Sequence, residues 1–130
     1  MLLVSFEHRD ALSAQLAALG SRVTAARRLP GIEQRLADSG AAVVLIDLRG
    51  AADQGLEAVK QIVPSAEQQG CVLVALYERR KRALLKQLVD AGISMVLPAP
   101  FTNEELAGAL ALAGRASRRA MGIPAPLVQK

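Results

Sequence analysis

The chain of 130 residues alternates between short apolar segments and longer segments with helical spacing, and this alternation restricts its fold more than any other feature. The apolar segments are rich in Val, Leu and Ile, and two of them, 41–47 and 71–76, are apolar almost throughout, as strands buried on both faces are. The expected strands are residues 2–6, 22–26, 41–47, 71–76 and 94–97. The expected helices are residues 11–19, 30–40, about 54–63, 80–91 and a last one that begins at Thr102.

Strict alternation of strands and helices predicts an α/β protein in which helices cover both faces of a parallel sheet. Five strands in about 120 residues match the flavodoxin-like doubly wound sheet of order 2-1-3-4-5, with five helices and three layers. In such sheets the functional crevice lies at the carboxyl ends of the strands. Two local signals refine the helices: Pro64 is expected to end the third helix near Val63, and Thr102 with Glu105 forms a capping box.

Length and composition indicate one domain over residues 1–120, followed by a Pro-containing tail or linker at 121–130. Hydrophobic residues make up 52% of the chain, which argues against disorder, yet no apolar run reaches the ~18 residues of a membrane span. The single Cys71 suits a reducing cytoplasm. Three aromatic residues are too few for a base-stacking surface, so we expect neither a membrane nor a nucleic acid as a direct partner.

Positive charge is concentrated in the second part of the chain. Residues 1–76 carry seven Lys and Arg against eight Asp and Glu, whereas residues 77–130 carry nine against four. The densest run, Arg79, Arg80, Lys81 and Arg82, opens the expected fourth helix, where cations oppose the helix dipole. This run is either a solvated face or a binding site for an anionic partner, such as an acidic protein or a cyclic dinucleotide.

The last expected helix is small and apolar on nearly all sides. Leu106 and Ala113 belong to its inward face, while Ala107, Ala111 and Leu112 lie toward the outer side, where a surface helix is normally polar. We therefore expect a homodimer through the fourth and fifth helices, with Ala107, Ala111 and Leu112 at its centre.

Two segments resemble the receiver domain of bacterial two-component response regulators. They are LIDLRG (45–50), with Gly55 eight residues after Asp47, and AGISMVLPAPFTNEEL (91–106), and the resemblance covers about residues 1–115. It implies a domain of two-component phosphorelays in which Asp47 stands at the phosphoacceptor position. It also points to the fourth helix, fifth strand and fifth helix as a pairing surface.

Most of the family's chemical positions are altered in this chain. Ser5 and Phe6 stand where two acids hold Mg²⁺, Ala99 precedes Pro100 where the family has a Lys, and either Leu76 or Tyr77 replaces a Thr or Ser. Only Asp47 remains. The resemblance therefore implies a pseudo-receiver, with no catalytic residue, metal or cofactor, that acts as an interaction module for a signalling protein or an attached output domain.

Two alternatives stay open. Asp47 could accept a phosphoryl group through an altered site, with Arg49 in place of the missing Lys charge and Glu7 or Asp53 near a shifted metal. The structural explanation that competes with this first alternative is that Asp47 caps the following turn or pairs with Arg49. The other alternative function is the binding of an anionic ligand at Arg79–Arg82.

Overall fold

The computed structural model describes residues 1–26, 30–93 and 95–120, with side chains up to Ser117 in the last helix. Within these residues five parallel strands form one sheet in the order β2-β1-β3-β4-β5, which confirms the expected doubly wound topology. The strands are β1 (Leu2–Ser5), β2 (Thr24–Ala26), β3 (Val43–Asp47), β4 (Val72–Glu78) and β5 (Met95–Ala99). The helices are α1 (Arg9–Ala18), α2 (Ile32–Ser39), α3 (Ala52–Gln69), α4 (Arg82–Asp90) and α5 (Asn103–Ala120).

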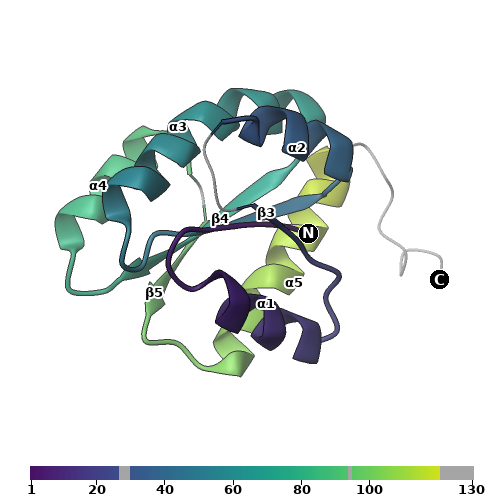
Figure 1. The fold of residues 1–130 in the computed structure, drawn as a ribbon. Helices are drawn as coiled ribbons and strands as arrows, with labels where there is room; N and C mark the ends of the chain where they lie inside the picture. The colour runs from purple at the N-terminus through teal and green to yellow at the C-terminus, as the bar shows by residue number, and fades with distance from the viewer. Residues whose placement is uncertain (27–29, 94, 121–130) are drawn as a thin grey trace.

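Helices cover both faces of the sheet and produce the expected three layers (Figure 1). On one face α1 and α5 contribute Leu12, Leu16 and Leu106 to a cluster with alternate residues of the central strands. On the other face α2, α3 and α4 form a larger cluster. Successive side chains of a strand point to opposite faces, so strands that are apolar throughout can supply both clusters.

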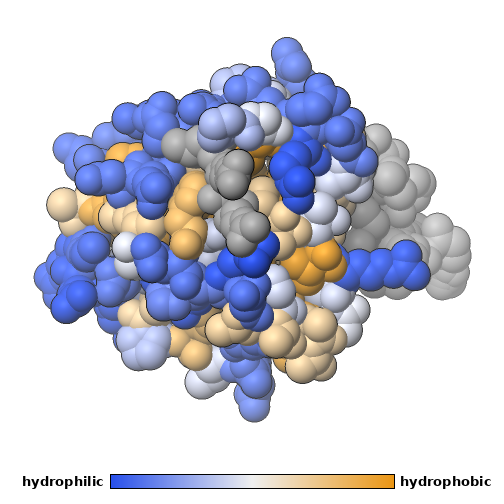
Figure 2. Space-filling view, in the orientation of Figure 1, coloured by the Kyte–Doolittle hydropathy of each residue, from blue (hydrophilic) through white to orange (hydrophobic). Residues whose placement is uncertain are grey.

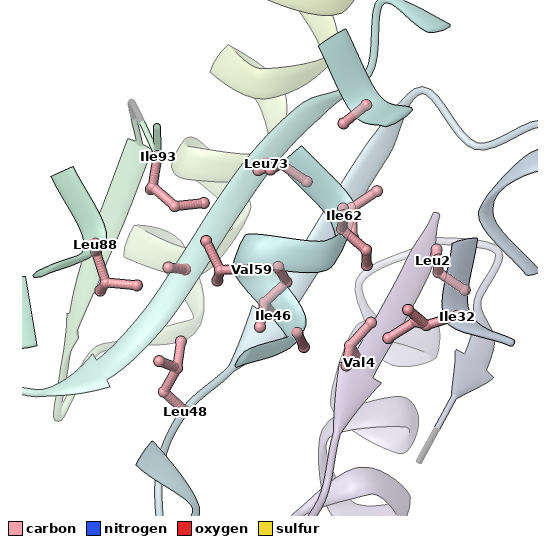
Figure 3. Packing of buried hydrophobic residues seen from close by; sticks show 14 of the residues in the cluster. Leu2, Val4, Ile32, Ile46, Leu48, Val59, Ile62, Leu73, Leu88 and Ile93 are labelled. Atoms are coloured by element: carbon pink, nitrogen blue, oxygen red, sulfur yellow. The ribbon is translucent and has the colours of Figure 1, made fainter. Parts of the chain in front are cut away.

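The larger cluster is centred on α3. Figure 3 shows Val59 and Ile62 of this helix packed near Ile46 of β3, with Leu88 of α4 close to the neighbouring part of the sheet. All four side chains are fully buried. At the start of α3 the packing is tight, because a Cβ added to Gly55 would lie 2.6 Å from Cγ of Leu48. A glycine there lets the helix approach the chain that leaves β3.

The expectation that Pro64 ends the third helix is wrong. The helix continues through Pro64, which is exposed, to Gln69. Proline removes one backbone hydrogen bond, at a cost of about 3 kcal/mol in a helix interior. Here the turn beyond it buries Ala66 against the sheet, and Gly70 ends the helix with positive φ while the Cys71 amide donates to the Ala66 carbonyl at 2.9 Å. Tertiary packing and the glycine cap outweigh the missing bond.

Other boundaries move by a few residues, and the last helix begins as expected. β4 continues to Glu78 because its pairing with β5 extends to Glu78 opposite Ala99, and α4 consequently begins at Arg82. At α5 the Glu105 amide donates to Thr102 Oγ1 at 3.0 Å, and the Thr102 amide donates to Glu105 Oε1 at 2.9 Å. This reciprocal pair confirms the capping box.

Among the described residues, no helix combines the length and apolar character that crossing a bilayer requires. The expected tail at 121–130 lies outside the described residues.

Candidate functional site

The carboxyl edge of the sheet brings together residues that are far apart in the sequence. In the strand register Ser5 of β1 lies beside Asp47 of β3, Asp47 beside Leu76 of β4, and Leu76 beside Leu97 of β5. Partner residues on neighbouring parallel strands point to the same face, so these four side chains form a row on the face covered by α1 and α5. Asp47 therefore sits in the middle of the edge where doubly wound sheets place their sites.

The Asp47 carboxylate is buried and both of its oxygens are bound. The residue is 1% exposed. Arg49 donates from Nε to Oδ1 at 2.8 Å and from Nη2 to Oδ2 at 3.2 Å, and the Arg49 backbone amide also donates to Oδ1 at 3.1 Å. The Ser5 hydroxyl donates to Oδ2 at 3.1 Å. This arrangement is a bidentate ion pair combined with a turn cap.

Two further contacts hold this group in place. The Arg49 guanidinium lies 5.3 Å from the centre of the Phe101 ring, in cation–π geometry. Ser5 Oγ accepts a hydrogen bond from the His8 amide at 3.2 Å, at the start of α1. Asp47, Arg49, Phe101, Ser5 and the backbone of His8 thus form one connected group.

The other positions that the sequence analysis selected lie in different places relative to Asp47. Of the two positions considered for the family's Thr or Ser, Leu76 lies beside Asp47, whereas Tyr77 is buried in the cluster on the opposite face of the sheet. Phe6 is half-buried and also packs against that cluster. Ala99 ends β5, where its carbonyl accepts the Arg79 amide at 3.1 Å, and Pro100 follows through a cis peptide bond.

The side chains at this edge do not fit the magnesium ion that receiver domains hold. Mg²⁺ needs oxygen ligands, preferably carboxylates. The two positions that supply them in the family are a hydroxyl that already donates to Asp47 and a phenyl ring. Within residues 1–26, 30–93 and 95–120, no three His, Cys, Asp or Glu side chains lie close enough together to hold a metal.

A cavity of about 700 Å³ opens beside Arg49, at the adjoining ends of β4 and β5. The surface near the loop that connects β4 to α4 is hydrophilic, at the left of the space-filling view (Figure 2). Three of the four residues of the basic run line the cavity; the fourth, Lys81, pairs with Glu78 at 3.2 Å instead. The lining residues are His8, Arg49, Glu78, Arg79, Arg80, Arg82, Ala99 and Pro100.

Glu78 carries the one carboxylate in this lining. A hydrogen bond from Lys81, helped by the charge of Arg80, lowers the pKa of Glu78 below its ordinary value. Arg80 donates to Glu78 Oε1 at 3.1 Å. Two cations therefore share one acid at this rim, and the described residues offer no ion-pair partner to Arg79 or Arg82.

The expected interface residues form an exposed strip on α5. Ala107, Ala111 and Leu112 are all exposed, with Leu112 at 53%. Val89 of α4 is exposed at 57%. These two are the most exposed of the large apolar side chains that the structure describes.

The sequence matches no protein-family model and no curated protein sequence. Its fold, however, matches solved receiver domains. The signal receiver domain of a modulated diguanylate cyclase from Desulfovibrio desulfuricans G20 matches with a TM-score of 0.73 and 16% identity, over 91% of this chain and 94% of that one. The receiver domain of NtrX from Brucella abortus matches with a TM-score of 0.67 and 20% identity, over 90% and 97%.

A third match is the receiver domain of Ssk1 from Saccharomyces cerevisiae, solved with the phosphotransfer protein Ypd1. Its TM-score is 0.71 at 19% identity, over 92% of this chain and 89% of that one. This chain therefore has a flavodoxin-like α/β fold of the kind found in signalling receivers. More specifically, its fold is that of the response-regulator receiver domain.

Sequence reasoning found the pairing of Asp47 with Arg49 as one alternative, but it missed the hydroxyl bond from Ser5 and the ring of Phe101. The Asp-x-Arg spacing signals the ion pair, since it follows a strand end directly. Ser5 contacts Asp47 across 42 residues and Phe101 contacts Arg49 across 52 residues, so no local sequence pattern indicates these contacts.

Proposed function

We propose that this chain is a pseudo-receiver, which regulates a signalling partner or an attached output domain without accepting a phosphoryl group on Asp47. The observation that carries the proposal is the occupation of both Asp47 oxygens by Arg49 and Ser5 in a buried site. We also expect the protein to work in the cytoplasm.

A carboxylate held in this way is a poor phosphoryl acceptor. Attack on phosphorus requires a free oxygen lone pair in line with the leaving group, and the negative oxygens of the transferred group need cations around them. Arg49 donates to both Asp47 oxygens, and reaching a phosphoryl group would require it to leave at least one of them. Ser5 and Phe6 replace the two acids of the family and Ala99 replaces its Lys, so the usual charge partners are missing.

The test is incubation with acetyl phosphate and Mg²⁺, followed by intact-mass spectrometry. We expect no stable added phosphate on the wild-type chain, under conditions in which a receiver domain with an intact acidic pair is modified. Asp47→Asn is the control that assigns any adduct. A phosphate that appears on the wild-type chain and is absent from Asp47→Asn would contradict the proposal and favour the altered-site alternative.

The change in Tm on adding a divalent metal is a second test of the same proposal. A ligand that binds only the folded state raises its free energy of unfolding by RT ln(1 + [L]/Kd). We expect millimolar Mg²⁺ or Mn²⁺ to leave Tm unchanged. An upward shift that Asp47→Ala abolishes would indicate a metal site at this edge.

Structural neighbours support the role in signalling. This chain covers 97% of the NtrX receiver domain but 27% of a longer NtrX structure, so in that protein the same fold is one part of a larger regulator. The Ssk1 receiver was solved in complex with Ypd1, which illustrates a receiver fold bound to a signalling partner. Both arrangements suit a module that transmits a signal by contact.

The partner that we propose for the α4 and α5 surface is a second copy of this chain. Along α5 the exposed strip begins with Glu104, continues through Ala107, Ala111 and Leu112, and ends with Arg115. Glu104 and Arg115 are 11 residues apart, about three helical turns, so they lie near one line along the helix. A two-fold axis that pairs two α5 helices antiparallel would place each Glu104 beside Arg115 of the second copy.

Small residues in the middle of the strip favour this packing, because Ala107, Gly108 and Ala111 let two helix backbones approach closely. Leu112 would contribute the largest apolar contact. The terminal charge pairs would set the register rather than supply the affinity.

Sedimentation or light scattering over a concentration series tests the dimer. We expect Leu112→Glu to give a folded monomer, and Leu19→Glu, an equally large exposed apolar side chain at the end of α1, to leave the dimer intact. Glu104→Arg and Arg115→Glu should each weaken the dimer, and the two together should restore it. A wild-type chain that stays monomeric at high micromolar concentration would show that the strip serves a different partner.

A further inference from the structure

We propose that the cavity between β4, β5 and the start of α4 binds a small organic phosphate with two phosphoryl groups, such as a nucleoside diphosphate or a cyclic dinucleotide. The inference goes beyond the pseudo-receiver role, because it concerns the lining of this cavity and not the reactivity of Asp47.

The position and size of the cavity suit a small ligand. It lies at the carboxyl edge of a doubly wound sheet, where such folds bind their ligands. Its volume of about 700 Å³ falls within the range of sites for small organic molecules and exceeds what a single inorganic phosphate fills. Four separate parts of the chain build it: the segment between β1 and α1, the loop after β3, the end of β4 with the loop that leads to α4, and the end of β5 with Pro100.

The charge of the lining indicates an anion. Four arginines face one carboxylate, that of Glu78, which is already shared by Arg80 and Lys81. Arg49 is matched by Asp47, but Arg79 and Arg82 have no acidic partner among the described residues. Like charges gathered around a cavity repel one another, and an anion with several charges relieves that repulsion.

The side-chain chemistry narrows the anion to phosphates. A guanidinium presents its N–H groups in a planar fork that matches phosphate oxygens in bidentate fashion. Arg79 and Arg82 are close in sequence yet belong to the loop and to the first residue of α4, so they offer two forks for two phosphoryl groups. Ala99 and Pro100 supply an apolar wall for the organic part of the ligand.

The experiment is isothermal titration at low ionic strength with four probes: pyrophosphate, ADP, a cyclic dinucleotide and the uncharged nucleoside adenosine. We expect at least one of the two organic phosphates to bind more tightly than pyrophosphate, and adenosine not to bind. Binding of ADP or of the cyclic dinucleotide then identifies which source of the two phosphoryl groups fits.

Three variants test the residues. Arg79→Gln with Arg82→Gln should weaken binding at least tenfold, because each lost charge-assisted contact corresponds to about a tenfold change or more. Glu78→Gln should strengthen binding, since it removes the one carboxylate of the lining. The control is Arg22→Gln, an exposed arginine just before β2 and so at the opposite edge of the sheet, which should have no effect.

Several results would overturn the inference. They are no binding of any phosphate at millimolar concentration, equal losses for the Arg79/Arg82 variant and for Arg22→Gln, or tightest binding to pyrophosphate. The loss of affinity counts only if the far-UV spectrum and Tm of the Arg79/Arg82 double variant are unchanged. If the double variant does not fold, Glu78→Gln still tests the inference, because it should raise the affinity. The mass-spectrometric test of Asp47 is independent, so the two proposals fail separately.

Discussion

Replacing Arg49 by Met should destabilise the fold far more than its position near the surface suggests. Met keeps the length of the aliphatic stem beside Phe101 but removes the guanidinium. The Asp47 carboxylate, whose side chain is 0% exposed, would retain the Ser5 hydroxyl and the backbone amide of residue 49 and lose the opposite charge. A buried charge left without its partner is the physical origin of the cost.

The size of the effect follows from the burial of the two groups. Breaking a fully buried pair costs about 3–5 kcal/mol. The Arg49 side chain is 24% exposed, so water already solvates part of the guanidinium and the expected loss is nearer 2–3 kcal/mol. For a chain of this length, a loss of that size lowers Tm by about 10 °C.

Urea denaturation followed by circular dichroism measures this loss, and the chain contains a matched control. Glu78 and Arg80 have the same spacing at the end of a strand, but Arg80 is 80% exposed, so Arg80→Met should change stability by less than about 0.5 kcal/mol. A double-mutant cycle of Arg49→Met with Asp47→Asn should give a coupling energy of about 2 kcal/mol. Equal effects of Arg49→Met and Arg80→Met, or a coupling energy near zero, would refute the reasoning.

Three further changes probe packing, capping and burial. Gly55→Ala should destabilise the fold by about 1–3 kcal/mol in urea denaturation, because its Cβ would meet Leu48. Gly108→Ala has open space around it within one chain, so in the monomeric Leu112→Glu background it should be neutral or stabilising. Thr102→Ala should cost about 1 kcal/mol by removing one half of the capping box, and Thr102→Ser should restore most of that loss. Burial raises the pKa of the Cys71 thiol, so its alkylation by iodoacetamide should reach half its limiting rate at a higher pH in the folded chain than in urea. Coincident pH profiles would contradict this.

The architecture could be predicted from the sequence because a strand that is buried on both faces is apolar at nearly every position. Segments such as 41–47 are apolar throughout only if helices cover both sides of the strand, and the connection rules of parallel sheets then leave few strand orders. The capping box could also be predicted, because Thr102 and Glu105 contact each other within one turn and their spacing is visible in the sequence. The boundary at Pro64 could not, because Ala66 and Gly70 decide it through packing and a cap beyond the proline.

For the site, the sequence by itself determined which chemical groups are present: Asp47 at the end of a central strand, and no second acid or Lys at the positions where the receiver family carries them. Only the tertiary structure decided what surrounds that carboxylate. The register of the sheet selected Leu76 rather than Tyr77 as its neighbour, and the chain reversals placed Ser5, Arg49 and Phe101 around it. The physical reason is that hydrogen bonds and ion pairs act over a few ångströms in space, and distance along the chain does not reveal which residues come that close.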